Sequence, residues 1–380
     1  MFSNPTKLEK PFIKSNIIIK FAIDFNAVMT SAYSDKAILL DGLVSGAGRV
    51  CAVVHSHPDG DALGSGAAFC RFVTGRYGKE CRLVVPNACP DTLDFVYGGV
   101  DFVDASADRD AALAAIASAD LIACLDMNAF DRAGVLEAPL GGSGAKKVLI
   151  DHHQNPDSAS FDLVVSETEV SSASELLYKL LLGLPDVGSA ADLPDGCGDA
   201  LMVGMTTDTN NFANSVYPST LAMASDLLAS GVDRDWLLSM IYNRYRENRV
   251  RAMGRFLDMK LKISGGGAAY MVIRKEDIRE FDLKEGDTEG FVNIPLTIDG
   301  VRLSLFLKED DGFFRVSVRS RRGTSASGLA RGYFHGGGHE CASGGRLFFP
   351  EDIPSRDEAE EYIEKVTARF LQMEDVAKQR

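Results

Sequence analysis

Four short apolar runs, separated by segments of helical periodicity, are the feature that most constrains how this chain of 380 residues can fold. The runs are Val50–His55, Cys81–Val85, Leu121–Asp126 and Val148–Asp151. Helical segments lie between them, among others Ala62–Tyr77 and Asp110–Ala117. Buried apolar strands that alternate with helices indicate a parallel sheet covered by helices. We therefore predict an α/β domain that begins near Lys36.

Acidic and imidazole side chains stand at the ends of three of these predicted strands. HSHPDGD begins at the end of the first strand, Asp126 ends the third, and the triplet DHH begins at the last residue of the fourth. In parallel α/β sheets, ligands bind beyond the carboxyl ends of the strands. We therefore expect the three groups to meet at one edge of the sheet, although Asp126 alone would equally suit a simple cap.

The first group has the composition of a metal site. His55, Asp59 and Asp61 follow one another at spacings of four and two residues, in a loop that contains Gly60. Carboxylate oxygens combined with imidazole suit Mn²⁺ or Mg²⁺ better than a metal that selects thiolates. A turn with side-chain hydrogen bonds before a helix is the structural alternative, and the DHH triplet downstream argues against it.

The second half of the chain predicts a smaller α+β domain. Helices are expected at Ser219–Ala229, Asp233–Tyr242 and Glu247–Met259, the last as a connector between domains. Strands are expected at Lys260–Ser264, Ala268–Ile273, Arg302–Lys308 and Phe313–Ser320. Hairpin turns would join them at Ser264–Gly267 and Glu309–Gly312.

A glycine-rich stretch after the last of these strands suits an anion. It reads RSRRGTSASGLARGYFHGGGHECASGG, from Arg319 to Gly345. Consecutive glycines let backbone N–H groups approach an anion closely, and Arg319 and His339 add charge-assisted hydrogen bonds. Ser325 or Ser327 is expected to cap the helix that follows. A glycine cluster by itself is typical of a loop.

The bulk composition excludes some classes of protein. A net charge of −14 argues against a protein that coats long nucleic acid, because that affinity comes mostly from neutralised phosphates. A local basic pocket for a small anion is expected from five clustered arginines: Arg315, Arg319, Arg321, Arg322 and Arg331. The seven cysteines include no CxxC pair, and we expect reduced, buried thiols in a cytoplasmic protein.

We interpret residues 1–35 as an extension outside the fold. The apolar stretch IIIKFAI is interrupted by Lys20 and followed by Asp24, and no apolar run approaches the roughly 20 residues that span a membrane. A signal peptide is the alternative interpretation. We favour an extension, or a natural start at Met29, and expect no association with membranes.

The order of the motifs resembles a known family. HxxPDxD, a later aspartate at a strand end, DHH, a later TDT and a distal GGGH together are similar to the DHH phosphoesterases with a DHHA1 C-terminal domain. Within that superfamily the chain most resembles the nanoRNase and pAp phosphatase branch, once called exopolyphosphatase-related. The likeness covers residues 36–370.

The resemblance implies a set of metal ligands. His55 and Asp59 would hold one divalent cation, and Asp126 would bridge it to a second. The second would be held by Asp61, His152 and Asp208. Mn²⁺ is the expected ion, with Mg²⁺ or Co²⁺ as alternatives. Two such ions about 3.5–4 Å apart clamp a phosphoryl group and lower the pKa of a shared water, which attacks phosphorus.

Further residues receive supporting roles from the resemblance. His153 would face the substrate phosphate and act with Asp126 in catalysis, and Asp151 would accept the second N–H of an imidazole. Arg132 would pair with a carboxylate near the site, or is a solvated helix arginine. The roles of two histidines stay open, because the family often has asparagine at His57 and glycine at His335.

The resemblance also implies a domain plan. Residues 36–243 would form the DHH catalytic domain, 244–259 a connector helix, and 260–372 a DHHA1 domain, with the active site in the cleft between the domains. The DHHA1 domain would bind the nucleotide end of the substrate. The residues expected to do so are Arg319, Ser320, Gly336, Gly337, Gly338 and His339.

The leading hypothesis is thus a two-metal phosphoesterase that hydrolyses very short oligoribonucleotides, pApA-like dinucleotides or 3′-phosphoadenosine 5′-phosphate. Alternatives are a cyclic di-AMP phosphodiesterase, a polyphosphate or pyrophosphate hydrolase, and an exonuclease for long strands. A non-catalytic nucleotide-binding module is the alternative of another class, and it would have no need of four carboxylates. Short RNA or a nucleotide is the expected partner, and a homodimer is one open arrangement.

Overall fold

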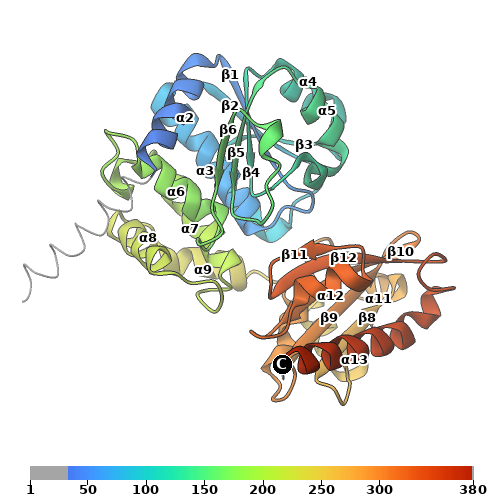
Figure 1. The fold of residues 1–380 in the computed structure, drawn as a ribbon. Coiled ribbons are helices and arrows are strands. Elements are labelled where there is room, and N and C mark those ends of the chain that lie inside the picture. The colour runs from blue at the N-terminus through green and yellow to red at the C-terminus, as the bar shows by residue number, and fades with distance from the viewer. Residues whose placement is uncertain (1–32, 379–380) are drawn as a thin grey trace, which may run out of the picture. The chain divides into compact units, whose positions relative to one another are not determined.

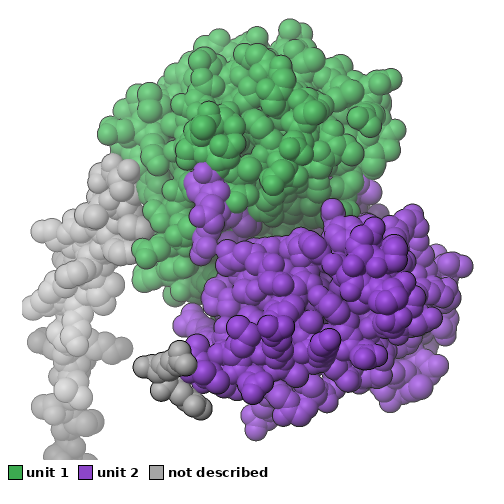
Figure 2. Space-filling view, turned by 45° about the vertical axis from the view of Figure 1, so that its right-hand side comes forward, with its two compact units in different colours: residues 1–87, 96–152, 157–234 green, residues 88–95, 153–156, 235–380 purple. Residues whose placement is uncertain are grey.

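The computed structural model describes residues 33–378, which fold as shown in Figure 1. Most of the expected extension, with its apolar stretch IIIKFAI and Met29, lies outside these described residues. The chain divides into two compact units, coloured separately in Figure 2. Unit 1 comprises the chain up to Asn87, Val96–His152 and Asp157–Arg234. Unit 2 comprises Ala88–Phe95, His153–Pro156 and the chain from Asp235 onward.

Unit 1 is built on a parallel sheet of six strands, in the order β3-β2-β1-β4-β5-β6. The strands are β1 (Arg49–Val54), β2 (Glu80–Val85), β3 (Asp101–Asp104), β4 (Leu121–Leu125), β5 (Lys146–Asp151) and β6 (Leu163–Ser166). The four predicted strands are confirmed as β1, β2, β4 and β5. Strands β3 and β6 were not predicted, because each has only four residues and partly exposed side chains, so the apolar stretch of each is very short.

The strand order determines where a ligand can bind in unit 1. Strand β1 pairs with β2 on one side and with β4 on the other. The chain therefore moves outward from β1 to β3, and then returns across β1 to begin β4. Such a reversal leaves a crevice beyond the carboxyl ends of the two strands that flank it. In this sheet those strands are β1 and β4.

Helices cover both faces of the sheet of unit 1 (Figure 1). They are α2 (Ser34–Gly46), α3 (Gly60–Tyr77), α4 (Arg109–Ser118), α5 (Glu137–Gly142), α6 (Ala173–Leu182), α7 (Cys197–Asp208) and α8 (Pro218–Ala229), and α9 (Arg234–Tyr242) follows at the boundary of the unit. The expected helices of this region begin only at Ser219, so α6 and α7 were not predicted. Every residue of α6 is buried, including Glu175 and Lys179, so the helix has no solvent-exposed face of the kind that a surface helix shows.

Glycines allow helices α3 and α7 to pack closely. A Cβ atom at Gly64 would lie 2.5 Å from the carbonyl oxygen of Ala200, and one at Gly60 would lie 2.4 Å from Thr207 Oγ1. Neither position therefore has room for a side chain. The first turn of α3, which contains Asp61, is held against the end of α7 as a result.

Unit 2 contains a mixed sheet in the order β11-β12-β10-β9-β8-β7. Its strands are β7 (Lys262–Ile263), β8 (Ala268–Ile273), β9 (Leu303–Glu309), β10 (Phe313–Ser320), β11 (Gly337–Gly338) and β12 (Ala342–Phe348). Both predicted hairpins are confirmed, because β7 pairs antiparallel with β8 and β9 pairs antiparallel with β10. The helices are α10 (Glu247–Met259), α11 (Lys275–Glu280), α12 (Ala326–Tyr333) and α13 (Ala359–Lys378).

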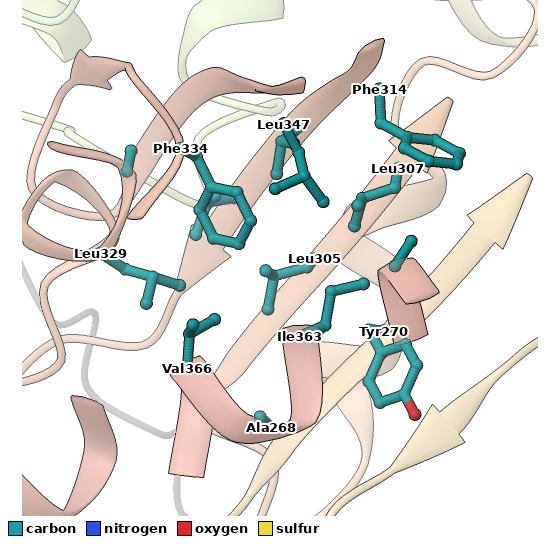
Figure 3. Packing of buried hydrophobic residues seen from close by; sticks show 14 of the residues in the cluster. Ala268, Tyr270, Leu305, Leu307, Phe314, Leu329, Phe334, Leu347, Ile363 and Val366 are labelled. Atoms are coloured by element: carbon teal, nitrogen blue, oxygen red, sulfur yellow. The ribbon is translucent and has the colours of Figure 1, made fainter. Parts of the chain in front are cut away.

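Two apolar clusters stabilise unit 2, one on each face of its sheet. Figure 3 shows the larger one, in which Leu305 and Phe314 from the strands pack with Leu329 of α12 and Ile363 of α13. The smaller cluster includes Phe256 of α10 together with Met271 and Phe306 from the strands. The helix predicted at Glu247–Met259 therefore forms with the expected bounds and packs on the sheet of unit 2.

Two predictions from the composition can be compared with this fold. All seven cysteines are free thiols, and five of them are buried, as expected of reduced residues. Within residues 33–378, no helix combines the length and the apolar character that crossing a membrane requires.

Candidate metal centre

Strand β1 delivers His55 to the carboxyl edge of the sheet. Its Nδ1 lies 2.9 Å from the carbonyl oxygen of Ser56, and a carbonyl only accepts, so Nδ1 carries the proton. The lone pair of Nε2 then faces Asp126 Oδ2 at 3.2 Å and Asp59 Oδ1 at 3.9 Å. Because carboxylates also accept, a proton or a metal ion is needed between these atoms.

The pKa of His55 reflects this need for a positive charge. Burial lowers the pKa of the imidazole, but the hydrogen bond and the charge of Asp126, with the charge of Asp59, raise it further, so the net pKa lies above its usual value. The positive charge of Arg132 acts in the opposite direction. A divalent cation would supply the same stabilisation as the proton.

Asp126 joins the ends of two strands. It directly follows β4 with a left-handed φ of 57°, which an aspartate tolerates better than most residues. Its backbone N–H donates to the carbonyl of Ile150 in β5 at 3.0 Å. Its second carboxylate oxygen, Oδ1, lies 3.5 Å from Nε2 of His152. Each oxygen of this carboxylate therefore faces a different histidine.

His152 lies between three carboxylates. It directly follows β5 and is buried, with Nε2 at 3.4 Å from Asp208 Oδ2 and 3.9 Å from Asp61 Oδ2 in addition to the contact with Asp126. Burial lowers the pKa of His152, but the charges of Asp208, Asp126 and Asp61 raise it well above its usual value. The surroundings of this imidazole thus attract a cation.

Asp61 is anchored by the start of another helix. Its Oδ2 accepts the backbone N–H of Ala173 at 2.7 Å and its Oδ1 accepts that of Ser174 at 2.9 Å. These amides begin α6, where the helix dipole favours a negative charge. Burial and the charges of Asp126 and Asp208 nevertheless raise the pKa of Asp61 well above its usual value. The anchoring fixes the carboxylate without neutralising it.

This anchor was not predicted, although a signal for it was present in the sequence. Ser172-Ala-Ser-Glu175 has the spacing of a helix start, and Ser172 Oγ does accept the N–H of Glu175 at 3.0 Å. The neighbouring α7 also contributes through Gly204, where a Cβ atom would lie 1.9 Å from Ser174 Oγ and 2.7 Å from Asp61 Oδ1. A larger residue at this position would displace both side chains.

Asp59 combines the two roles that the sequence left as alternatives. It is the N-cap of α3, because its Oδ1 accepts the N–H of Asp61 at 3.0 Å and that of Ala62 at 3.1 Å. Its side chain is half exposed and also faces His55. A capped helix start and a cluster of candidate ligands therefore occur together.

Together these residues form two overlapping groups of potential ligand atoms. His55, Asp59 and Asp126 make one group, and Asp61, Asp126 and His152 make the other, with the atoms of each group within 4.8 Å of one another. The donors are hard oxygens and imidazole nitrogens, which fits a divalent cation such as Mn²⁺ or Mg²⁺. The structure thus brings together, in unit 1, all six residues of the expected ligand set, including Asp208 at the end of α7.

Residues around the carboxylate cluster of unit 1 include Asp151 and Arg132, which were predicted to have supporting roles. Asp151, the last residue of β5, is fully buried, with a carboxylate oxygen within 4.8 Å of one of Asp126. The carbonyl of Arg132 accepts the N–H of Ser56 at 2.7 Å. Asn210 and Asn211 follow α7 in a turn and have left-handed φ values of 47° and 56°.

Two of the remaining histidines have distinct surroundings. His57 is exposed and is bound by Asn87, a residue after β2 that the motifs did not single out. His153 begins the segment His153–Pro156 that groups with unit 2. The catalytic role of His153 stays a prediction.

In unit 2, the predicted substrate-binding residues lie around β10 and β11. Arg319 is the last residue on the partly exposed face of β10. Its Nη1 donates to the carbonyls of Val318 at 3.0 Å and Ser343 at 3.4 Å. The hydroxyl of Ser320 donates to the carbonyl of Thr324 at 2.6 Å. Ser325 is the confirmed N-cap of α12, since its Oγ accepts the N–H of Gly328.

The GGGH segment has a packing role as well as a predicted binding role. A Cβ atom at Gly336 would lie 1.9 Å from the carbonyl of Gly344, and one at Gly338 would lie 2.8 Å from that of Ala342. His335 keeps the loop backbone with a left-handed φ of 46°. The backbone N–H of His339 donates to the carbonyl of Ala342 at 2.8 Å.

The predicted arginine cluster is only partly assembled. Arg315 and Arg319 lie on the same side of β10, but Arg315 pairs with Asp310 at 2.7 Å and Glu285 at 3.0 Å. Arg321 donates to the carbonyls of Leu296 and Ile298. Much of the positive charge is therefore already used within unit 2.

Comparison with known proteins identifies the family. Residues 49–205 match the DHH family, N-terminal domain, and residues 265–368 match the DHHA1 domain. A crystal structure of an exopolyphosphatase-related protein from Bacteroides fragilis has 33% sequence identity and a TM-score of 0.80, covering 90% of this chain and 98% of that one. The chain belongs to the DHH/DHHA1 phosphoesterase family.

Two curated relatives in this family carry names with an activity. The bifunctional oligoribonuclease and PAP phosphatase NrnA of Bacillus subtilis is 28% identical over 300 residues, which are 78% of this chain and 89% of the relative. The protein of the same name from Thermus thermophilus is 28% identical over 329 residues, 86% of this chain and 92% of the relative. This DHH protein is accordingly a phosphoesterase, and the family implies a divalent metal.

Proposed function

We propose that this chain is a two-metal phosphoesterase that hydrolyses very short oligoribonucleotides, pApA-like dinucleotides among them, and 3′-phosphoadenosine 5′-phosphate. The observation that carries the proposal is Asp126, whose Oδ2 lies 3.2 Å from His55 Nε2 and whose Oδ1 lies 3.5 Å from His152 Nε2. A carboxylate that bridges two ions through its two oxygens directs each oxygen to a separate set of ligands. The names of the relatives from Bacillus subtilis and Thermus thermophilus support the substrate class.

The ligands divide between two positions in this proposal. His55 and Asp59 hold one cation, and Asp126 is shared. The residues of the other position are Asp61, His152 and Asp208. Two divalent cations, Mn²⁺ in this proposal, would lower the pKa of a shared water and offset the charge of the phosphoryl group.

The residues of the chain keep the geometry rigid around these positions. The carbonyl of Ser56 keeps the proton of His55 on Nδ1, so that Nε2 offers its lone pair. The amides of Ala173 and Ser174 keep both oxygens of Asp61 in place. A site held in this way loses little entropy when it binds its ions, which favours the arrangement needed in the transition state.

We assign recognition of the nucleotide to unit 2. Arg319 and His339 are the residues that bind it in this proposal, and His153 contacts the phosphate. Alanine variants of Arg319 and His339 should weaken binding of pApA while a generic aryl phosphodiester is still cleaved. An equal loss on both substrates would show that these residues serve the chemistry instead of recognition.

A substrate panel tests the proposal as a whole. Purified protein with added Mn²⁺ would be given pApA, 3′-phosphoadenosine 5′-phosphate, cyclic di-AMP, polyphosphate and a long RNA strand. We expect AMP from pApA, phosphate from 3′-phosphoadenosine 5′-phosphate, and slow turnover of the rest. The His152→Ala variant should keep its fold by circular dichroism and lose turnover. Turnover of polyphosphate alone, or an active His152→Ala variant, would reject the proposal.

A further inference from the structure

Glu175 lies in the first turn of α6, the helix whose amides anchor Asp61. Its Oε2 accepts the backbone N–H of Ser171 at 3.0 Å and the hydroxyl of the same serine at 2.5 Å. In the other direction, the backbone N–H of Glu175 donates to Ser172 Oγ at 3.0 Å. Reciprocal hydrogen bonds of this kind close the turn that begins a helix. The side chain of Glu175 therefore holds the turn at its first residue.

The two amides that bind Asp61 lie inside this closed turn. Ala173 donates its N–H to Asp61 Oδ2 at 2.7 Å, and Ser174 donates its N–H to Asp61 Oδ1 at 2.9 Å. The direction of a backbone N–H is fixed by the backbone that carries it, and a hydrogen bond weakens steeply when its geometry is lost. The contact between Glu175 and Ser171 therefore influences Asp61 through the backbone of the turn.

The carboxylate of Glu175 is itself held by α8. Ser219 donates its hydroxyl to Oε1 at 2.6 Å, and Thr220 donates its hydroxyl to Oε2 at 2.7 Å. Lys179 forms an ion pair with Oε1 at 2.6 Å. All of these residues are buried, and a buried polar network whose members all have partners rigidifies its surroundings. The start of α6 is thus fixed against α8 through one carboxylate.

The two oxygens of this carboxylate have different tasks. Oε1 receives the ion pair with Lys179, whose buried charge requires a partner. Oε2 receives both contacts from Ser171. The first task concerns the stability of the fold, and the second concerns the place of the turn. An uncharged side chain with an oxygen at the place of Oε2 can perform the second task alone.

We propose that Glu175 is a positioning residue of the metal centre. By binding the N–H and the hydroxyl of Ser171, it keeps the turn where its amides bind both oxygens of Asp61, and it thereby sets the affinity of the cation position to which Asp61 belongs. This inference rests on the proposed function, which divides the ligands between two cations. The other position shares only Asp126 with this one, so its affinity should depend on Glu175 much less.

Two double variants isolate the contact with Ser171. Glu175→Met/Lys179→Met and Glu175→Gln/Lys179→Met both remove the buried ion pair, so neither leaves a charge without its partner. Methionine and glutamine are unbranched and similar in length, but only glutamine keeps an oxygen that accepts hydrogen bonds well. A difference between the methionine variant and the glutamine variant therefore reports on the acceptor and not on the charge.

Binding of Mn²⁺ alone is the first measurement. Metal-free, full-length protein would be titrated with Mn²⁺, and the free ion would be counted by its electron paramagnetic resonance signal. We expect two bound ions in the wild type and in the glutamine variant. In the methionine variant one ion should bind about 10- to 100-fold more weakly, as in Asp208→Asn, which lacks a ligand of the same position. Equal binding by the two double variants, or equal weakening of both ions, would overturn the inference.

Hydrogen exchange in the metal-free protein tests the turn itself. Peptides that contain the amides of Ala173 and Ser174 should exchange faster in the methionine variant than in the wild type. The glutamine variant should keep the protection of the wild type, and peptides from α13 in unit 2 serve as the control for global opening. Unchanged exchange in the methionine variant would show that Glu175 does not hold the turn, and the inference would then be wrong.

A milder pair of variants decides the question if the methionine variant does not fold. Thr220→Val removes one hydroxyl that holds Oε2 and should weaken the same ion to a smaller extent. Thr367→Val is the matched control, because Thr367 is equally buried and its hydroxyl donates to the carbonyl of Ile363 within α13. This control should bind both ions as the wild type does. Equal Mn²⁺ affinities in the two valine variants would contradict the role of Glu175.

Turnover of pApA separates this inference from the proposed function. The methionine variant should need about 10- to 100-fold more Mn²⁺ than the wild type for half-maximal turnover, and the glutamine variant should need much less. Equal requirements in both double variants would overturn the inference and leave the proposed function intact. A wild type that binds two ions but is inactive on the whole panel would reject the proposed substrates, while the Mn²⁺ titration still decides the role of Glu175. A wild type that binds fewer than two ions would reject both.

Discussion

The two six-stranded sheets of this protein differ in whether a buried carboxylate is paired with a basic side chain. At the carboxyl edge of the sheet in unit 1, Asp61, Asp126 and Asp208 gather around His152. In unit 2, the buried Glu309 pairs with Arg356 at 3.0 Å. Like charges in a buried place are costly, so the first group requires a cation from outside, whereas the pair in unit 2 requires none.

Unit 1 also contains a compensated charge, which shows that the distinction is one of pairing and not of domain. Glu175 is fully buried in α6 and lies 2.6 Å from Lys179. Burial raises the pKa of Glu175, but Lys179 and the hydroxyls of Ser171 and Ser219 lower it more, so that the net pKa falls below its usual value. The pKa of Asp61 is raised instead, because burial and two neighbouring carboxylates outweigh the nearby imidazole.

The sharpest test of the comparison is the Asp126→Asn variant. Asparagine tolerates the left-handed φ of this position, so the fold should be kept, while loss of the shared charge should lower kcat/KM on the order of 10³-fold. Thermal unfolding of the metal-free variant should occur at or above the temperature of the wild type, because repulsion within the cluster falls. A variant that unfolds earlier would mean that the cluster is structural.

The opposite outcome is expected at the compensated carboxylate. Glu175→Gln leaves the charge of Lys179 buried without its partner and should lower the free energy of unfolding by about 3–5 kcal/mol, measured by urea denaturation. The double variant Glu175→Gln/Lys179→Met is the control and should recover much of the loss. An unaffected single variant would show that water reaches the pair.

The same carboxylate predicts the pH dependence of stability. The folded pKa of Glu175 lies below its usual value, so its contribution is present above that usual value, about 4.3, and is lost as the pH falls through the folded pKa. The acid unfolding curve of Glu175→Gln should therefore be flatter than that of the wild type in this range. Equal slopes would contradict the assignment.

Metal binding should change the free energy of unfolding by less than the Glu175→Gln substitution does. Adding Mn²⁺ at about 100 times its Kd should stabilise the metal-free wild type by about 2.7 kcal/mol, seen as a rise in Tm. The Asp126→Asn variant should show a much smaller rise. A similar rise in both proteins would mean that Mn²⁺ binds elsewhere.

The smallest change in the free energy of unfolding is expected where charges are paired at the surface of unit 2. Glu285 lies 3.0 Å from Lys308 and 3.0 Å from Arg315, and its side chain is partly exposed. Glu285→Gln should change the free energy of unfolding by less than about 1 kcal/mol and leave kcat unchanged. A large loss of stability in this variant would contradict the expected difference between surface ion pairs and buried carboxylates.

Much of the fold follows from local sequence patterns. β1, β2, β4 and β5 contain short apolar runs, interrupted in β2 by Arg82, that are largely buried on both faces. Such runs can be recognised in isolation. The elements that were not predicted have weaker local signals. β3 and β6 are short and partly exposed. α6 is buried on every side, so only the spacing of Ser172 and Glu175 at its start marks it.

The candidate site could likewise be predicted in part. The spacing of His55, Asp59 and Asp61, together with the DHH triplet, is enough to indicate a metal centre. The anchoring of Asp61 by Ala173 and Ser174 could not be predicted, because it joins residues more than one hundred positions apart. The hydrogen bonds between Asn87 and His57 could not be predicted either. They join residues 30 positions apart that follow two neighbouring strands.

Residue types and their spacing along the chain suffice to predict the kinds of ligand, their order and the family to which the protein belongs. They do not tell which oxygen of Asp126 faces which histidine, or on which nitrogen His55 carries its proton. The folded chain settles both. The physical reason is that a proton is placed by the donor or acceptor opposite it. That partner is brought there by the order of strands in the sheet.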